Sequence, residues 1–81
     1  MSSTSPRRFT LRTTDRPDTL PRVITLLRRR GCDLIRVDYA RAGSHRPGHL
    51  EIVVDAGGRP HRLRAWLLEL VDVVEVEVEE A

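Results

Sequence analysis

Residues 73–79 read Val-Val-Glu-Val-Glu-Val-Glu, the most regular pattern in the chain. From residue 74 on, valines at the even positions alternate with glutamates at the odd positions, and this period of two predicts a strand with one apolar and one acidic face. Such a strand is half-buried, because successive side chains point to opposite faces of a sheet. The run therefore requires other strands beside it and a layer packed against its valine face.

Two preceding segments, on either side of residue 45, carry apolar residues at helical spacing. The first is expected to begin near Asp15 or Asp18, either of which can cap a helix, and to end in Arg28-Arg29-Arg30 before Gly31. The second begins with Pro60, which fits a first helical turn. The two apolar stripes are Leu20, Val23, Ile24 and Leu27, and Leu63, Trp66, Leu67 and Leu70.

Three further segments are predicted to be strands, at residues 7–14, 33–41 and 49–55. The first two alternate apolar and polar residues, whereas the third is nearly all apolar and is expected to be buried on much of both faces. A turn-rich stretch at residues 42–48 predicts a hairpin loop between the second and the third. The alternating apolar residues are Phe9, Leu11 and Thr13 in the first strand, and Ile35, Val37 and Tyr39 in the second.

The order strand-helix-strand-strand-helix-strand predicts an α+β fold of the ferredoxin-like, split βαββαβ type. Its simplest closure is a four-stranded antiparallel sheet with two helices on one face, which leaves the other face open. We expect residues 1–6 to form a disordered tail and residues 7–80 to form a single domain. In this topology the first and last strands are neighbours.

The charge of the chain is segregated between its two ends. Residues 1–30 hold eight arginines and two aspartates, whereas residues 71–81 hold five acids and no base. This distribution fits either a nucleic-acid patch or internal pairing of the ends. The adjacency of the end strands favours pairing, with Arg8 and Arg12 opposite the glutamates of residues 75–79, and we expect no nucleic-acid partner.

Several classes of function lack the residues that they need. RNA recognition of this shape uses stacked aromatic residues, but the chain has one Phe, one Tyr and one Trp. His45, His49 and His61 lack the spacing of a metal site, and Cys32 beside Asp33 lacks the surroundings of a reactive thiolate. No apolar run approaches the roughly 20 residues that cross a bilayer. We therefore expect a cytoplasmic, non-enzymatic protein with no membrane contact, metal or cofactor of its own.

Two stretches resemble a known family. Asp15-Arg16-Pro17 with Leu20, followed by Arg22-Val23 and the helix end Arg29-Arg30-Gly31, is similar to the loop and first helix of ACT domains. Residues 68–76, Leu-Glu-Leu-Val-Asp-Val-Val-Glu-Val, resemble the ending of the small, regulatory subunit of acetolactate synthase (acetohydroxyacid synthase). The length resembles the short single-domain form of that subunit.

This resemblance implies a non-catalytic, activating subunit in branched-chain amino-acid biosynthesis. Its partner would be the acetolactate synthase catalytic large subunit, which holds the thiamine diphosphate. Members of the family dimerise through the second strand and bind a branched-chain amino acid between the first loop of one chain and the second strand of the other. By position, the effector residues are Asp15, Pro17, Asp18, Thr19, Leu20 and Asp33, and the dimer edge is Ile35, Arg36, Val37, Asp38 and Tyr39.

The chain departs from the family at the effector positions. Where sensing members carry Asn, Gly and Asn, this chain has Asp15, Asp18 and Asp33. Three carboxylates would repel the carboxylate of an amino acid, and a side chain at position 18 hinders close backbone approach. The sequence thus predicts weak or absent sensitivity to valine. The alternative is a free-standing ACT homodimer that binds an amino acid and regulates another protein.

Overall fold

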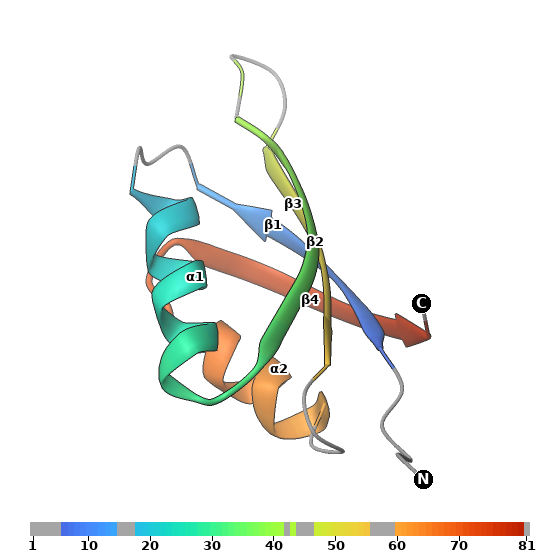
Figure 1. Cartoon of the computed structure of the whole chain (residues 1–81). Coiled ribbons are helices and arrows are strands. Elements are labelled where there is room, and N and C mark those ends of the chain that lie inside the picture. Colours follow the sequence, from blue (N-terminus) through green and yellow to red (C-terminus); the bar gives the residue numbers. More distant parts are fainter. Residues whose placement is uncertain (1–5, 15–17, 42, 44–46, 56–59, 81) are drawn as a thin grey trace, which may run out of the picture.

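The computed structural model describes residues 6–14, 18–41, 43, 47–55 and 60–80 (Figure 1). Residues 1–5 of the expected tail and most of the expected hairpin loop lie outside these residues. The described elements follow the order predicted from the sequence, so that prediction is confirmed. They are β1 (Arg7–Thr13), α1 (Thr19–Arg29), β2 (Asp33–Ala40), β3 (Gly48–Asp55), α2 (Pro60–Leu68) and β4 (Val73–Glu80).

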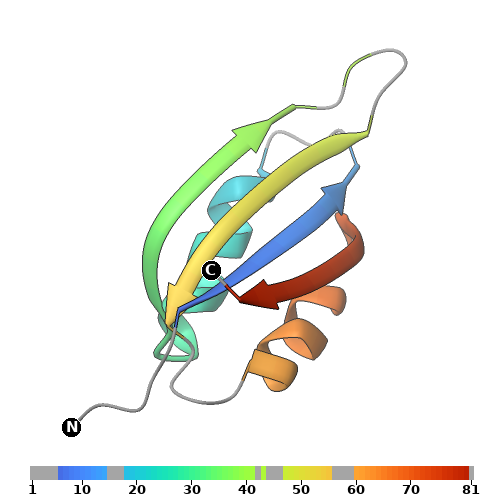
Figure 2. The same ribbon diagram turned by 90° about the vertical axis from the view of Figure 1, so that its right-hand side faces the viewer.

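The four strands form one antiparallel sheet in the order β2-β3-β1-β4. Both helices cover the same face of this sheet (Figure 1), and none of the described elements covers the opposite face (Figure 2). The predicted ferredoxin-like fold is therefore confirmed. β2 and β4 form the two edges of the sheet. In the chain, β2 follows α1 and β4 follows α2.

The hydrophobic core lies between the sheet and the two helices. The alternation predicted for β1 is confirmed, since Phe9, Leu11 and Thr13 are each at most 2% exposed. The other buried apolar residues are Val23 and Leu27 of α1, Leu50, Ile52 and Val54 of β3, Leu63 and Leu67 of α2, and Val73 and Val76 of β4.

No helix in the described part of the chain is long and apolar enough to cross a membrane.

The end of α1 is closed by Gly31, as the sequence predicted. Gly31 adopts a φ of 69°, a conformation that other residues rarely take. Its N–H donates to the Arg28 carbonyl at 3.2 Å, and the Cys32 N–H donates to the Leu27 carbonyl at 2.9 Å. These two bonds satisfy carbonyls that the end of a helix leaves without partners, and they turn the chain into β2.

A bulge in β4 corrects the simple alternation of its valines. The register with β1 shifts between Arg12 and Thr13, so Thr13 pairs with Val73. Val73 is 7% exposed and takes the buried position, whereas Val74 is 64% exposed. A bulge inserts one extra residue into a strand, which reverses the face of the residues beyond it. The prediction that Val74 faces the core was wrong for this reason.

A second bulge lies in β2, at the other edge of the sheet, and it interrupts the alternation that was predicted for this strand. The register with β3 shifts between Leu34 and Arg36, which leaves Ile35 as the extra residue, 56% exposed. Leu34 packs against the core in its place, together with Tyr39.

Strand β3 is less enclosed than expected. Its residues alternate between buried and half-buried or exposed positions, and Val53 is only half-buried. Val53 pairs with Arg8 of β1 and Arg36 of β2, whose side chains are not part of the core. The prediction of burial on much of both faces was wrong, because no helix or strand in the described ranges covers the second face of the sheet (Figure 2).

The charges at the two ends of the chain meet on β1 and β4. Arg8 pairs with Glu79 at 3.6 Å and Arg12 with Glu75 at 3.3 Å, at the positions that the register places opposite each other. The predicted internal pairing is confirmed. All four side chains are more than a third exposed, so each pair contributes about 0.2–1 kcal/mol at most.

Candidate functional site

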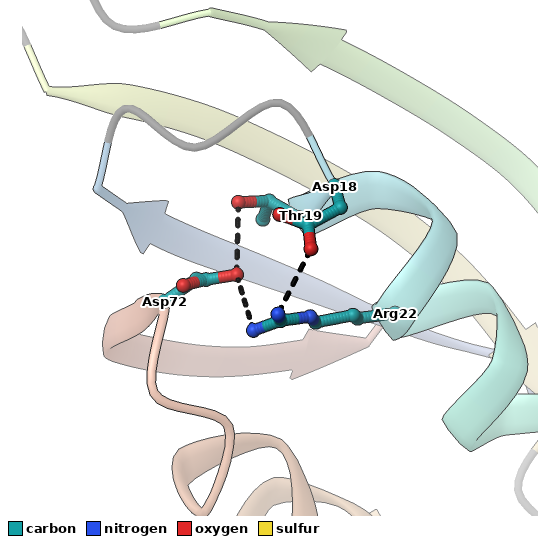
Figure 3. Close-up of polar contacts among 4 residues, drawn as sticks. All are labelled: Asp18, Thr19, Arg22 and Asp72. Atoms are coloured by element: carbon teal, nitrogen blue, oxygen red, sulfur yellow. Dashed lines mark hydrogen bonds and ion pairs between the residues drawn. The ribbon is translucent and has the colours of Figure 1, made fainter.

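The start of α1 and the turn between α2 and β4 lie against each other. The N–H of Thr14, just after β1, donates to the carbonyl of Asp72 at 2.8 Å. Asp72 belongs to the turn that precedes β4, so this bond joins segments that are distant in the sequence. The side chains of Asp18, Thr19, Arg22 and Asp72 converge at this junction (Figure 3), and we call these four residues the Asp72 cluster.

Asp72 is the centre of the cluster and is only 1% exposed. Its Oδ2 accepts a hydrogen bond from Thr19 Oγ1 at 3.3 Å and one from Arg22 Nη1 at 3.2 Å. A buried carboxylate is stable only when it is paired and hydrogen-bonded. Thr19 is itself 1% exposed, so a buried hydrogen bond holds the first residue of α1 to Asp72.

Arg22 joins the buried carboxylate to an exposed one. Its Nη2 lies 2.8 Å from Oδ2 of Asp18, one helical turn earlier, and its Nη1 pairs with Asp72. One guanidinium is therefore shared by two carboxylates, and the cluster carries an excess of negative charge. Such a cluster attracts an ammonium group more readily than a carboxylate.

Asp15 or Asp18 was expected to cap α1, and of these two only Asp18 lies within the described residues. Asp18 occupies the N-cap position, but its side chain makes no capping hydrogen bond. Its carboxylate turns to Arg22 instead, and its main-chain carbonyl accepts from the Arg22 N–H at 3.1 Å. An acid four residues before a base is favourable on a helix, and here that pairing replaces the cap.

The expected effector residues are only partly brought together. Asp18 and Thr19 lie in the cluster, and Leu20 is half-buried against the core. Asp33 follows the opposite end of α1, a helix of 11 residues that spans about 16 Å. Within one chain, Asp33 therefore cannot share a site with Asp18. Asp15 and Pro17 lie outside the described residues.

Arg22 and Asp72 were not singled out as site residues from the sequence. The spacing of Asp18 and Arg22 was the available indication for the first, because acids and bases four apart on a helix face each other. For Asp72 the indication was an acid inside an otherwise apolar run. Its partners lie 50 and 53 residues away, so the sequence alone could not identify them.

The expected dimer edge occupies β2, which has a neighbour on one side only. Ile35 and Val37 are 56% and 41% exposed, and Arg36 and Asp38 are exposed as well. Tyr39 is half-buried and packs on the core. The residues assigned to the edge are thus on an edge, with apolar surface available beside the free main-chain groups.

Metal-ligating residues do not gather in the described ranges. No group of three or more His, Cys, Asp or Glu side chains there could hold a metal ion. His49 lies on β3 and His61 on α2, and His45 lies outside the described residues.

No protein-family model and no curated protein matches the sequence. Solved structures that resemble the fold include the following three. The ACT domain from the GTP pyrophosphokinase of Chlorobium tepidum superposes with a TM-score of 0.78 over 95% of this chain and 100% of that one, at 8% identity. The P2 domain of the chemotaxis kinase CheA from Thermotoga maritima, solved with the response regulator CheY, gives 0.74 over 98% and 100%, at 12% identity.

The third structure is the C-terminal domain of the MgtC protein from Mycobacterium tuberculosis, with a TM-score of 0.69 over 100% of this chain and 92% of that one, at 18% identity. At these identities the likeness concerns the fold alone. The chain has an ACT-like fold, which it shares with domains of a signalling kinase and of MgtC.

Proposed function

We propose that this protein is a non-catalytic ACT-type subunit that binds and activates the thiamine-diphosphate-dependent catalytic subunit of acetolactate synthase. The proposal combines the ACT-like fold with the two sequence stretches that resemble the regulatory subunit of that enzyme. Under this proposal the cofactor and all the reacting groups belong to the catalytic partner.

The observation that supports the proposal most is the Asp72 cluster. Thr19 and Arg22 come from the stretch that resembles ACT domains, and Asp72 comes from the stretch that resembles the regulatory subunit. Two stretches chosen for their resemblance alone therefore meet in one hydrogen-bonded unit. The topology already places the start of α1 beside the turn before β4, and in this chain side-chain hydrogen bonds also join the two stretches there.

The proposal predicts a rise in the turnover of the cognate acetolactate synthase. The catalytic subunit is assayed for acetolactate formation alone and with a saturating amount of this protein, after the two have been shown to co-purify. The protein by itself serves as the control and should form no acetolactate. An unchanged turnover in a complex that demonstrably forms would contradict the activating role.

We also expect weak or undetectable binding of valine, because Asp18 and Asp33 supply carboxylates at the positions that would meet the carboxylate of an amino acid. Asp18→Gly removes one of these charges and frees the backbone, so this variant should bind valine more tightly than the wild type. Isothermal titration calorimetry measures both. Tight valine binding by the wild type would refute this expectation.

A free-standing sensor is the second candidate. The exposed apolar edge of β2 favours a homodimer, which is the form that this candidate requires. The two candidates differ in the partner, so co-purification with the catalytic subunit separates them. A homodimer that binds an amino acid but does not bind the catalytic subunit would support the sensor.

A further inference from the structure

A groove opens on the helical side of the molecule. It has a volume of about 320 Å³ and lies between α1 and the turn after α2. Leu26 and Leu70 are half-buried and the other lining residues are exposed, so the groove is a surface depression. Its lining residues are Pro21, Arg22, Thr25, Leu26, Arg29 and Leu70.

The two arginines of the groove differ in their surroundings. Arg22 is already paired with Asp18 and Asp72. Arg29 lies seven residues later on α1, about 10 Å along the helix, and no carboxylate among the described residues forms an ion pair with it. At one end of the groove the arginine is therefore held by two carboxylates, and the other end presents a cation available to a partner.

Two residues close to Leu70 in the chain also expose apolar side chains. Leu68 and Val71 flank the groove residue Leu70 in the chain, and they are 38% and 69% exposed. Contiguous exposed apolar side chains with a polar rim mark sites of protein association. An occupant that matches this surface must carry apolar side chains together with an acid.

We propose that the groove receives an acidic, apolar segment of the catalytic subunit. The apolar side chains of that segment rest on Leu26 and Leu70, and its carboxylate pairs with Arg29. This inference rests on the proposed function and names the surface that it requires. A small carboxylate is a poorer occupant, because small-molecule sites bury most of their ligand and this depression is open.

Arg28 provides a matched control for Arg29. Both lie in the last turn of α1, where the helix dipole favours basic residues, and both are exposed, but only Arg29 lines the groove. Arg29→Glu should weaken binding to the catalytic subunit by at least about tenfold, because it turns an attractive pair into a repulsive one. Arg28→Glu should change the affinity by less than about threefold. Biolayer interferometry with the immobilised catalytic subunit measures both.

The outcomes of this experiment distinguish failure of the groove from failure of the proposed function. Equal effects of the two variants, or no effect of Arg29→Glu, overturn the groove while the proposed function stands. A wild type with no affinity for the catalytic subunit sinks the proposed function instead.

In that case designed helical peptides with leucine anchors and either a glutamate or a lysine test the groove directly. The glutamate peptide should shift the amide resonances of Leu26, Arg29 and Leu70 in the full chain. An equal response to both peptides overturns the proposal. A response to isovalerate, a small apolar carboxylate, without a response to either peptide also overturns it.

Discussion

Asp72→Asn is expected to lower the free energy of unfolding by about 2 kcal/mol, which corresponds to a fall in Tm of roughly 8–16 °C in a domain of this size. The asparagine side chain has the shape of the aspartate but lacks the negative charge to which Thr19 and Arg22 donate hydrogen bonds. The full cost of breaking a buried ion pair is not reached, because Arg22 is 43% exposed and keeps Asp18. Urea denaturation of both proteins measures the difference.

Asp18→Asn is the matched control, because it removes the other carboxylate bound by the same guanidinium. The Asp18 side chain is 52% exposed, so this change should cost no more than about 0.5 kcal/mol. Equal losses for the two variants would show that burial of Asp72 is not what stabilises the cluster.

A double-mutant cycle with Thr19→Val tests whether the cluster acts as a unit. Thr19 and Asp72 share a hydrogen bond, so the effects of removing both should fall short of the sum of the single effects. Additive losses would mean that the hydroxyl and the carboxylate stabilise the chain independently.

Hydrophobic periodicity was sufficient to predict every element of this fold, because each helix and strand carries its own repeat. Two of the errors arose at Ile35 and Val74, which are the extra residues of two bulges. A bulge depends on the register with the neighbouring strand, and no pattern within one strand encodes it. The Asp72 cluster escaped prediction for a related reason, since its members come from opposite ends of the chain.

The two edges of the sheet are not equivalent, and this difference predicts where a second copy binds. On β4, the side chain of Arg64 from α2 donates to the main-chain carbonyl of Val76 at 3.2 Å. This contact, with four glutamates along the strand, protects β4 against pairing. Within the described residues, no side chain forms a comparable bond to the main chain of β2.

The charges on β2 indicate how that copy is oriented. Asp38 lies opposite Glu51 of β3, which is a like-charge pair, and Arg36 lies opposite Val53. A second β2 strand that runs antiparallel about a two-fold axis near Val37 would place Arg36 of each copy beside Asp38 of the other. Arg36→Asp should therefore weaken the dimer, and addition of Asp38→Arg should partly restore it.

The largest effect on assembly is expected from Val37→Asp. Near a two-fold axis this single change brings two carboxylates together and removes apolar contact from both copies, so the dimer should dissociate at least about tenfold more readily. Val78→Asp is the control, because Val78 is 36% exposed on the protected edge, close to the 41% of Val37. Sedimentation velocity over a concentration series distinguishes the variants. A wild type that stays monomeric at all concentrations would refute the dimer, and equal weakening by both variants would refute the assignment of β2 as the pairing edge.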